Sequence, residues 1–467
     1  AREAGFDAYV VTQHAGQEVN SPDTLYTYWT DPNNLTANPC HKTFFPTAED
    51  GGECVPLLPG GGFPDYTTVP DPRAPLVRGV NFPTSAVSPP YDEFKSWCSA
   101  ADAITDPNFV ALCGSEWTVG SVDPNNCVEG VTATQQGHIN EFYGANPDWP
   151  CASGGVHVCP TEEQVYAHAA QWNGLAYKAH PKLRADRMDD PESAGCSNLD
   201  ISYKPFSSEF PAGFDQDRMP VVESGAKNFF RRDAVLELLR RGYRVGIATG
   251  SDAHHRPCDV GVFRLPATDA PVTIVYAQNL TRSDLISALK DRLTFASMGY
   301  LDQPPDVRFW VQDDCPTPMG GTVRPKTIPL NLRAEVWQDP MIAQIRPASR
   351  SIQQISIVGF SAAGESSPVV RHTCSMSSPG VGCSCTNDVT THGCSIDVGI
   401  AASDGPLWVE AYAPDGKLIL WSTAIYVNHC SYIQATGSGV PCESLTPLPL
   451  LPYTPAALRE AYGAEMP

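Results

Sequence analysis

The sequence lacks long apolar runs, internal repeats and a recognisable signal segment. No stretch approaches the roughly 18 apolar residues that a membrane-spanning helix requires, so we expect no membrane span. No charged, then apolar, then small-residue segment opens the chain, which fits a processed or truncated start. Basic residues are also scarce: 31 Lys and Arg stand against 52 Asp and Glu, a formal net charge of -21. So acidic a surface repels phosphate backbones, which excludes nucleic acid as an expected partner.

A small anionic substrate stays compatible with this charge, because a bound divalent metal dominates the field around itself. We therefore expect a small-molecule substrate. The 42% hydrophobic content over 467 residues is ordinary for a globular protein of two or three domains.

Cysteine pairs of the CxxC type are absent, although the chain has 16 cysteines. This pattern favours disulfides formed in an oxidising compartment, and hence a secreted, periplasmic or cell-surface protein. Cys383 and Cys385 are too close to pair with each other, so with Cys374 and Cys394 we expect them to join one loop to different neighbours. A structural zinc site that uses His392 is the alternative, although its ligand spacing fits no common zinc finger.

Three regions of the chain differ in composition and in their pattern of predicted strands and helices. In residues 1–303 short apolar strands alternate with helices, which predicts a mainly parallel sheet that closes into an α/β barrel. A Pro- and Gly-rich stretch at about 18–91 interrupts this region as an irregular insertion that could cover a site. Residues 304–436 contain strand-like segments between turn residues, which predicts an all-β sandwich, and residues 437–467 form a Pro-rich C-terminal strap.

Potential metal ligands stand at the ends or starts of five predicted strands. They are His14, Glu116, His138, His180, Asp252 and His254. Because functional residues of parallel barrels converge at the carboxyl ends of the strands, we expect these side chains to meet in one pocket. Imidazole and carboxylate ligands suit Zn, Mn or Fe.

The most specific of these segments is GSDAHH at residues 250–255. A tight turn there presents Asp252 and His254 on the same side, within reach of neighbouring metals. His255 and Arg256 would bind substrate or belong to a solvated loop.

Two further polar residues have structural interpretations. Glu223 follows another strand, and we expect it to support the site through a hydrogen bond. His168 lies on a predicted helix over residues 161–171, where placement at the surface or in the core is favoured over metal ligation.

Four segments resemble, in order, motifs of the PHP (polymerase and histidinol phosphatase) superfamily of metallohydrolases. Residues 1–15 resemble its second motif, residues 114–118 the motif with a bridging Glu, residues 178–181 the Ala-His-Pro motif, and residues 249–254 the final Gly-Ser-Asp-Ala-His motif. The match spans roughly 300 residues. The segments DRLTFASMGY, PMGGTV and LWSTAIYVN are similar to the carbaryl-hydrolase-like branch.

The resemblance implies a distorted (β/α)7 barrel with about two or three divalent metal ions. Glu116 would bridge metals, His138 and His180 would complete one of them, and Asp252 would hold a second. His14 and His254 would share a third metal or bind substrate.

The implied activity is a secreted metal-dependent hydrolase that uses metal-activated water on a phosphate ester, or on a carboxylic or carbamic ester or amide. Glu116, Asp252 and His254 would be its catalytic residues.

Two departures from the family pattern favour an alternative. The His-x-His motif of the first strand is absent, and Gln13 stands where the family has Asp. Either the strand with this motif precedes residue 1, as we expect, or the site is incomplete. The alternative is a catalytically impaired PHP-fold protein with a structural or binding role outside the cell. Attachment to carbohydrate or a surface through the β-sandwich is compatible with both.

Overall fold

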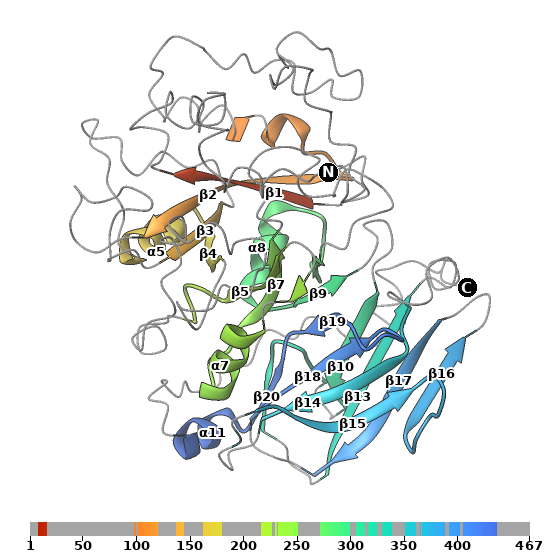
Figure 1. Ribbon diagram of the computed structural model, residues 1–467. Coiled ribbons are helices and arrows are strands. Elements are labelled where there is room, and N and C mark those ends of the chain that lie inside the picture. The colour runs from red at the N-terminus through yellow and green to blue at the C-terminus, as the bar shows by residue number, and fades with distance from the viewer. Residues whose placement is uncertain are drawn as a thin grey trace, which may run out of the picture.

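Figure 1 shows a computed structural model of the chain. It describes residues 8–15, 98–99, 101–119, 137–143, 162–179, 216–226, 229–230, 232–250, 271–298, 305–312, 316–324, 329–338, 351–360, 365, 367–387, 392–401 and 405–436. The predicted insertion at 18–91 and the predicted strap at 437–467 lie outside these residues. No helix among the described residues combines the length and the apolar character needed to cross a membrane.

The first sheet has seven strands, in the order β1-β2-β3-β4-β5-β6 with β7 paired to β5. Its strands are β1 (Ala8–Ala15), β2 (Val110–Val119), β3 (Gly137–Tyr143), β4 (Leu175–Lys178), β5 (Val221–Ala226), β6 (Phe229–Phe230) and β7 (Gly246–Gly250). Strands β1 and β2 are parallel, as are β4, β5 and β7, but β3 runs antiparallel to both of its neighbours.

The predicted (β/α)7 barrel is therefore wrong. The described part of the chain is mostly strand, 52% against 19% helix, with only 5 short helices, and its sheets include a half-barrel rather than a closed parallel barrel. The error has a physical cause: an alternation of strands and helices along the sequence does not fix the direction in which neighbouring strands pair. Reversal of β3 breaks the all-parallel order that such a barrel needs.

Helices cover both faces of this sheet (Figure 1). They are α5 (Glu162–Gln171), α7 (Asp233–Arg241) and α8 (Arg282–Lys290), and α11 (His429–Thr436) follows the last strand of the chain. Helix α7 connects the parallel strands of a βαβ unit and ends at Gly242, whose φ of 88° is the left-handed conformation that glycine adopts readily. The chain can thus turn directly from α7 toward β7.

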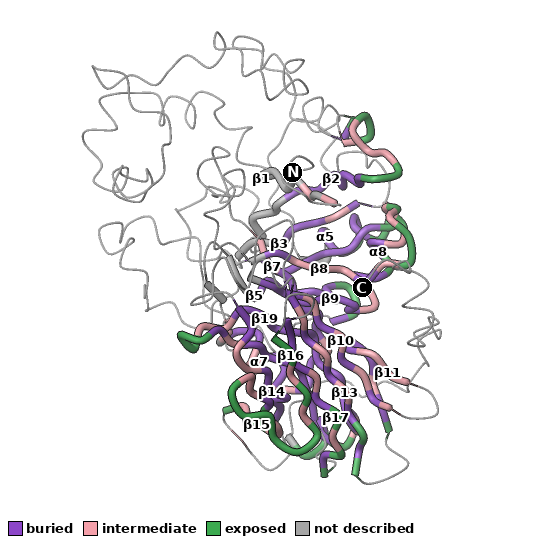
Figure 2. The backbone as a smooth tube through the Cα atoms, turned by 90° about the vertical axis from the view of Figure 1, so that its right-hand side faces the viewer, coloured by how far each residue is buried: buried purple, intermediate pink, exposed green. Residues whose placement is uncertain are grey.

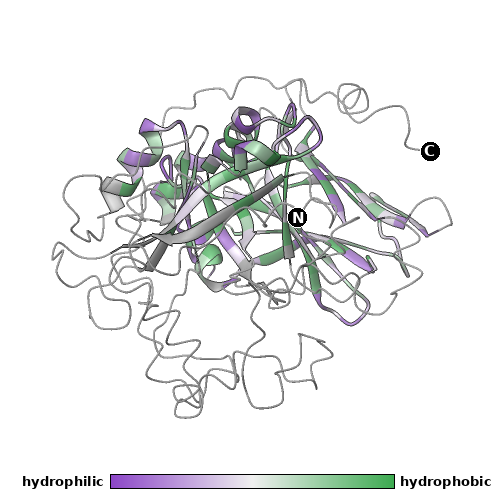
Figure 3. Cartoon of the chain, turned by 90° about the horizontal axis from the view of Figure 1, so that it is seen from above, coloured by the Kyte–Doolittle hydropathy of each residue, from purple (hydrophilic) through white to green (hydrophobic). Residues whose placement is uncertain are grey.

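Strand alternation decides which helix packs on which face. Ala176, Val222 and Ile247 belong to a buried cluster with residues of α5 and α7, whereas their neighbours Tyr177, Val221 and Ala248 belong to a cluster with residues of α8. A fully buried aliphatic side chain contributes about 1.5–3 kcal/mol, so these clusters hold the helices in place. Figure 3 shows hydrophilic and hydrophobic residues side by side on helices and strands, as expected of elements with one buried face.

The remaining strands form a five-stranded sheet, β11-β10-β13-β17-β16, and an eight-stranded sheet, β12-β20-β18-β19-β9-β8, in which β14 joins β18 and β15 joins β14. The five strands are β10 (Asp306–Val311), β11 (Thr317–Pro318), β13 (Leu330–Gln338), β16 (Cys383–Asn387) and β17 (His392–Ile400). The eight strands are β8 (Pro271–Val275), β9 (Thr294–Met298), β12 (Thr322–Val323), β14 (Gln354–Gly359), β15 (Val369–Ser375), β18 (Gly405–Tyr412), β19 (Leu418–Ser422) and β20 (Ile425–Val427).

These two sheets share one hydrophobic core. Phe309 and Leu332 of the five-stranded sheet pack in the same cluster as Ile355, Val409 and Leu420 of the eight-stranded sheet. In Figure 2 buried residues predominate on inner strands such as β14 and β19, whereas β15 and β16 are mostly half-buried or exposed. The strands β8 and β9, which precede residue 303, pair with each other, and β9 pairs with β19. Strands on both sides of the predicted boundary at 303–304 therefore share a sheet.

The free edge of β7 is capped by hydroxyl side chains. Beside this edge, three alternate backbone N–H groups donate to hydroxyls from other strands or their connections: Val245 to Tyr426 at 2.8 Å, Ile247 to Thr423 at 2.9 Å and Thr249 to Thr273 at 2.8 Å. Edge strands present unpaired N–H groups that other chains can bind. The capping hydroxyls satisfy these donors and connect β7 to the eight-stranded sheet.

Candidate functional site

The predicted ligands belong to strands that meet at one edge of the seven-stranded sheet. Strands β1, β2, β4, β5 and β7 end at this edge, and the antiparallel β3 begins there. Of His14, Glu116 and His138 the structure describes the backbone alone. His180, Asp252 and His254 lie outside the described residues, shortly after the ends of β4 and β7.

The pairing register aligns several of these positions. Residue 14 of β1 pairs with residue 116 of β2, which pairs with Asn140 of β3. Asn140 pairs in turn with Tyr177 of β4. Residue 138 stands two positions before Asn140 on the same strand, opposite Thr118. Four strands thus carry polar residues in one row close to the shared edge.

Three polar side chains that the structure does describe lie in this row or beside it. Asn140 is 7% exposed, and its amide oxygen has no hydrogen-bond partner within the described part of the chain. Tyr177 and Glu223 are buried as well. A Cβ atom added to Gly250 would lie 3.1 Å from Glu223 Oε1 and 3.3 Å from the Tyr177 hydroxyl. The end of β7 therefore packs directly against a carboxylate and a phenol.

Asn140 and Tyr177 were missed by the sequence interpretation. A signal for Asn140 was present, because the alternation of a strand puts residues 138 and 140 on the same face. Tyr177 had a comparable signal as a polar residue of the strand that precedes His180. Glu223 was expected to support the site, and its contact with Gly250 is compatible with that role.

The opposite face of β2 and β3 carries a buried polar network centred on Glu141. Its carboxylate, 0% exposed, accepts hydrogen bonds from Ser115 Oγ at 3.3 Å and from the Tyr143 hydroxyl. His168 Nδ1 of α5 lies 3.1 Å from the same carboxylate oxygen. A buried carboxylate is costly unless it is hydrogen-bonded, so this network fixes β2, β3 and α5 relative to one another. The position of Glu116, next to Ser115, is fixed with them.

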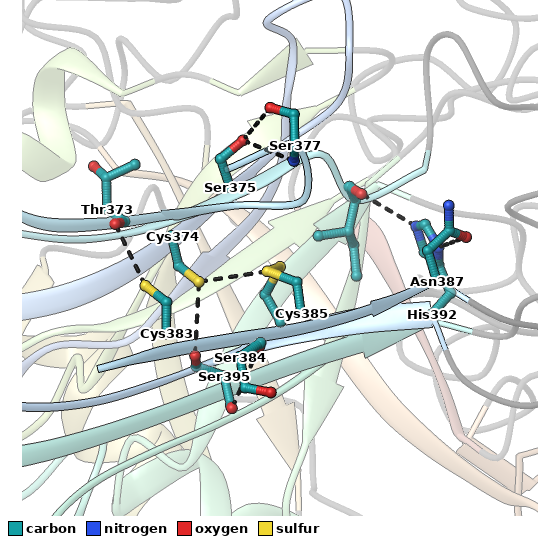
Figure 4. The surroundings of a disulfide bond; sticks show 12 residues. Thr373, Cys374, Ser375, Ser377, Cys383, Ser384, Cys385, Asn387, His392 and Ser395 are labelled. Carbon is teal, nitrogen blue, oxygen red and sulfur yellow. Dashed lines mark hydrogen bonds between the residues drawn. A yellow bond between two sulfur atoms is a disulfide. The ribbon is translucent and has the colours of Figure 1, made fainter. Parts of the chain in front are cut away.

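A second group of potential metal ligands lies in the five-stranded and eight-stranded sheets, which together form the β-rich region. The sulfur atoms of Cys374, Cys385 and Cys394 all lie within 4.8 Å of one another. Cys385 and Cys394 form a disulfide, while Cys374 and Cys383 are free thiols. Figure 4 shows Cys374 on β15 facing the cysteines of β16. Because a disulfide offers no thiolate, these three sulfurs would bind a soft metal only after reduction.

His392 does not contribute to this cysteine cluster. Its Nδ1 lies 3.0 Å from Asn387 Oδ1, and its Nε2 lies 3.1 Å from the Ile352 carbonyl oxygen. The ring thus faces Asn387 and the Ile352 carbonyl, and His392 is not a member of the cysteine group that could hold a metal. The prediction of disulfides is confirmed for Cys385–Cys394 and for Cys98–Cys113.

No protein-family model matches the chain, and no curated protein matches its sequence. The resemblance to the PHP superfamily therefore stays a prediction that rests on the four sequence motifs.

Proposed function

We propose that this chain is a metal-dependent hydrolase with its active site at the edge where β1, β2, β4 and β7 end. Its substrate is a small phosphate ester, or a carboxylic or carbamic ester or amide. The pairing register is the observation that carries the proposal: positions 14, 116, 140 and 177 form one row across four strands. Export is part of the proposal, supported by the Cys98–Cys113 and Cys385–Cys394 disulfides.

The donor set fits a divalent cation. Imidazole and carboxylate groups at 14, 116, 138, 180, 252 and 254 would hold the ions, as Zn, Mn and Fe prefer. The buried amide oxygen of Asn140, without a hydrogen-bond partner in the described residues, is one more neutral oxygen suited to such an environment. Bound metal ions lower the pKa of water and polarise the oxygen of the bond under attack.

The described side chains would orient the attacking water or the substrate, and they would exclude bulk solvent from the site. Asn140 can accept a hydrogen bond from the attacking water through Oδ1 or donate one to the substrate through Nδ2. The Tyr177 hydroxyl and the Glu223 carboxylate, buried against Gly250, form a side of the site at the end of β7 from which water is excluded. Exclusion of water strengthens the electrostatic interactions within the site.

The test compares the full chain with Glu116→Gln and with Asn140→Leu. Metal content of the purified proteins is measured by elemental analysis, and hydrolysis of p-nitrophenyl phosphate and p-nitrophenyl acetate is measured with added Zn, Mn or Fe. We expect Glu116→Gln to lose bound metal and to lower kcat/KM by about 100-fold or more. Asn140→Leu should lower kcat/KM by roughly tenfold to 100-fold with metal retained.

Glu335→Gln is the matched control, because Glu335 pairs with Arg333 on β13 in the five-stranded sheet. It should leave metal content and activity unchanged. A wild-type chain that carries no stoichiometric metal and hydrolyses neither ester would contradict the proposal and favour a non-catalytic binding role.

A further inference from the structure

The cysteine cluster bridges the two sheets of the β-rich region. Cys374 lies on β15, which pairs with β14 at the border of the eight-stranded sheet. Cys383 and Cys385 lie on β16, the last strand of the five-stranded sheet. Cys394 on β17 pairs directly with Cys385. The existing disulfide therefore joins neighbouring strands of one sheet, while the free thiol of Cys374 belongs to the other (Figure 4).

The distance between the sheets is short at this point. Cys374 Sγ lies 3.4 Å from Cys385 Sγ. A thiolate attacks a disulfide sulfur directly, and the Cys374 sulfur is within contact distance of the sulfur that it would attack. Cys374 and Cys394 are buried, at 0% and 3% exposed, while Cys385 is half-buried, so an external thiol has restricted access to this bond, on the side of Cys385.

We propose that Cys374 and the Cys385–Cys394 disulfide form an internal thiol–disulfide exchange site, which transfers the covalent link from within the five-stranded sheet to a position between the two sheets. The Cys374 thiol loses its proton, and its sulfur attacks Cys385 Sγ. A Cys374–Cys385 bond forms, the Cys385–Cys394 bond breaks, and Cys394 leaves as a thiolate that takes up a proton. One disulfide and one thiol are present before and after, so the step needs no oxidant or reductant.

The surroundings of Cys374 keep this reaction slow near neutral pH. Burial and the neighbouring Cys383 thiol raise the pKa of Cys374 to about 12. The unreactive thiol form therefore predominates. As long as the pH is below that pKa, each increase of one pH unit should raise the exchange rate about tenfold.

Few other ionisable groups face this sulfur. Strand β14 has no titratable residue, and its Ile355 pairs with Cys374. On β16, Cys383 lies 3.6 Å from His372 Nε2 of β15. On β17, His392 is held by Asn387 and Ile352, and Asp397 lies within 3.8 Å of Arg333. Of these titratable groups, the Cys383 thiol is the one that raises the pKa of Cys374, and its sulfur lies near His372 Nε2.

The experiment maps disulfides in the full chain by mass spectrometry of a non-reduced digest, after free thiols are blocked with N-ethylmaleimide at acidic pH. Wild-type protein held at pH 6 should give the Cys385–Cys394 linkage. The same protein held at pH 9 should gain the Cys374–Cys385 linkage about 1,000-fold faster than at pH 6. Cys394→Ser lacks the starting disulfide, so, oxidised with glutathione disulfide, it should supply the Cys374–Cys385 linkage as a reference for the digest. Cys374→Ser should keep Cys385–Cys394 at both pH values.

Cys383→Ser is the matched control, since it removes a neighbouring thiol without removing the attacking or leaving sulfur. It should still form the Cys374–Cys385 linkage at pH 9. Loss of the linkage in Cys383→Ser would overturn the assignment of Cys374 as the attacking group. A fixed Cys374–Cys383 disulfide in the wild-type protein, or four thiols released together with stoichiometric zinc, would overturn the proposal itself. The wild-type measurement stands alone if Cys394→Ser does not fold.

Discussion

The hydroxyl of Thr423 accepts a hydrogen bond of 2.9 Å from the Ile247 amide, across 176 residues of sequence. Both residues are fully buried. Thr423→Val keeps the volume but leaves the Ile247 amide without this acceptor, which should lower the free energy of unfolding by about 1–3 kcal/mol. Thr423→Ser should restore most of the loss. Urea denaturation followed by tryptophan fluorescence measures both; equal stabilities for the valine and serine variants would contradict the expected role.

Glu410 connects α7 to β18. Its buried carboxylate accepts hydrogen bonds from Arg232 and from the Tyr412 hydroxyl, and from Trp408 Nε1 at 2.8 Å. Glu410→Gln removes the charge that faces Arg232, and we expect a loss of about 1–3 kcal/mol in urea denaturation. Glu335→Gln, in a partly exposed pair, should cost at most about 0.5 kcal/mol. A loss no larger for Glu410→Gln than for this control would refute the assignment.

His429 should make stability depend on acid pH. Burial, with the positive charges of Arg244 and Arg292, lowers its pKa to about 4, although the hydrogen bond of 2.5 Å with the Gly242 carbonyl opposes this. Since the ordinary value is 6.5, the unfolded chain takes up a proton at this position before the folded chain does. The stability of the folded state that depends on neutral His429 is complete above about pH 6.5 and is lost as the pH falls toward about 4.

The decrease in the free energy of unfolding that is due to His429 should reach about 3 kcal/mol. His429→Gln keeps a donor for the Gly242 carbonyl but does not titrate. We expect the difference in unfolding free energy between wild type and variant to shrink or reverse between pH 7 and pH 4. Parallel pH profiles of the two proteins would show that His429 is not the responsible group.

The Cys98–Cys113 disulfide should contribute to stability through its loop. A closed loop with a sequence separation of 15 residues is worth about 3 kcal/mol in the unfolded-state entropy model. The double variant Cys98→Ser with Cys113→Ser should lose about this amount, and reductant should then have a smaller effect on its midpoint of denaturation than on that of wild type. An unchanged midpoint in the double variant would argue against the stabilising role.

Local structure was largely predictable from the sequence, and the pairing of distant strands was not. Apolar runs at 110–113, 139–143 and 175–177 lie within β2, β3 and β4, and the predicted helix at 234–241 lies within α7. These signals are local, set by residue type and periodicity. The antiparallel direction of β3 depends on contacts with β2 and β4, which no local pattern encodes, and so the predicted barrel was wrong.

At the candidate site, too, local features were predictable from the sequence and features that depend on strand pairing were not. Strand ends could be located from their sequences, which is why residues 14, 116 and 138 were singled out. The row that connects residue 116 to Asn140 and Tyr177 requires the register between strands, and the Glu141 network requires in addition the approach of α5. Side chains whose role depends on a neighbouring strand stay hidden until that neighbour is known.

The hydroxyl caps along β7 have a consequence for shortened versions of the protein. A fragment that stops before residue 423 would retain β7 but lose two of its three acceptors, the hydroxyls of Thr423 and Tyr426. The donors of Val245 and Ile247 would then be available to a strand from another molecule, which is how β-structured proteins begin to polymerise. Expression of such a fragment would yield insoluble material even if every residue of the seven-stranded sheet were present.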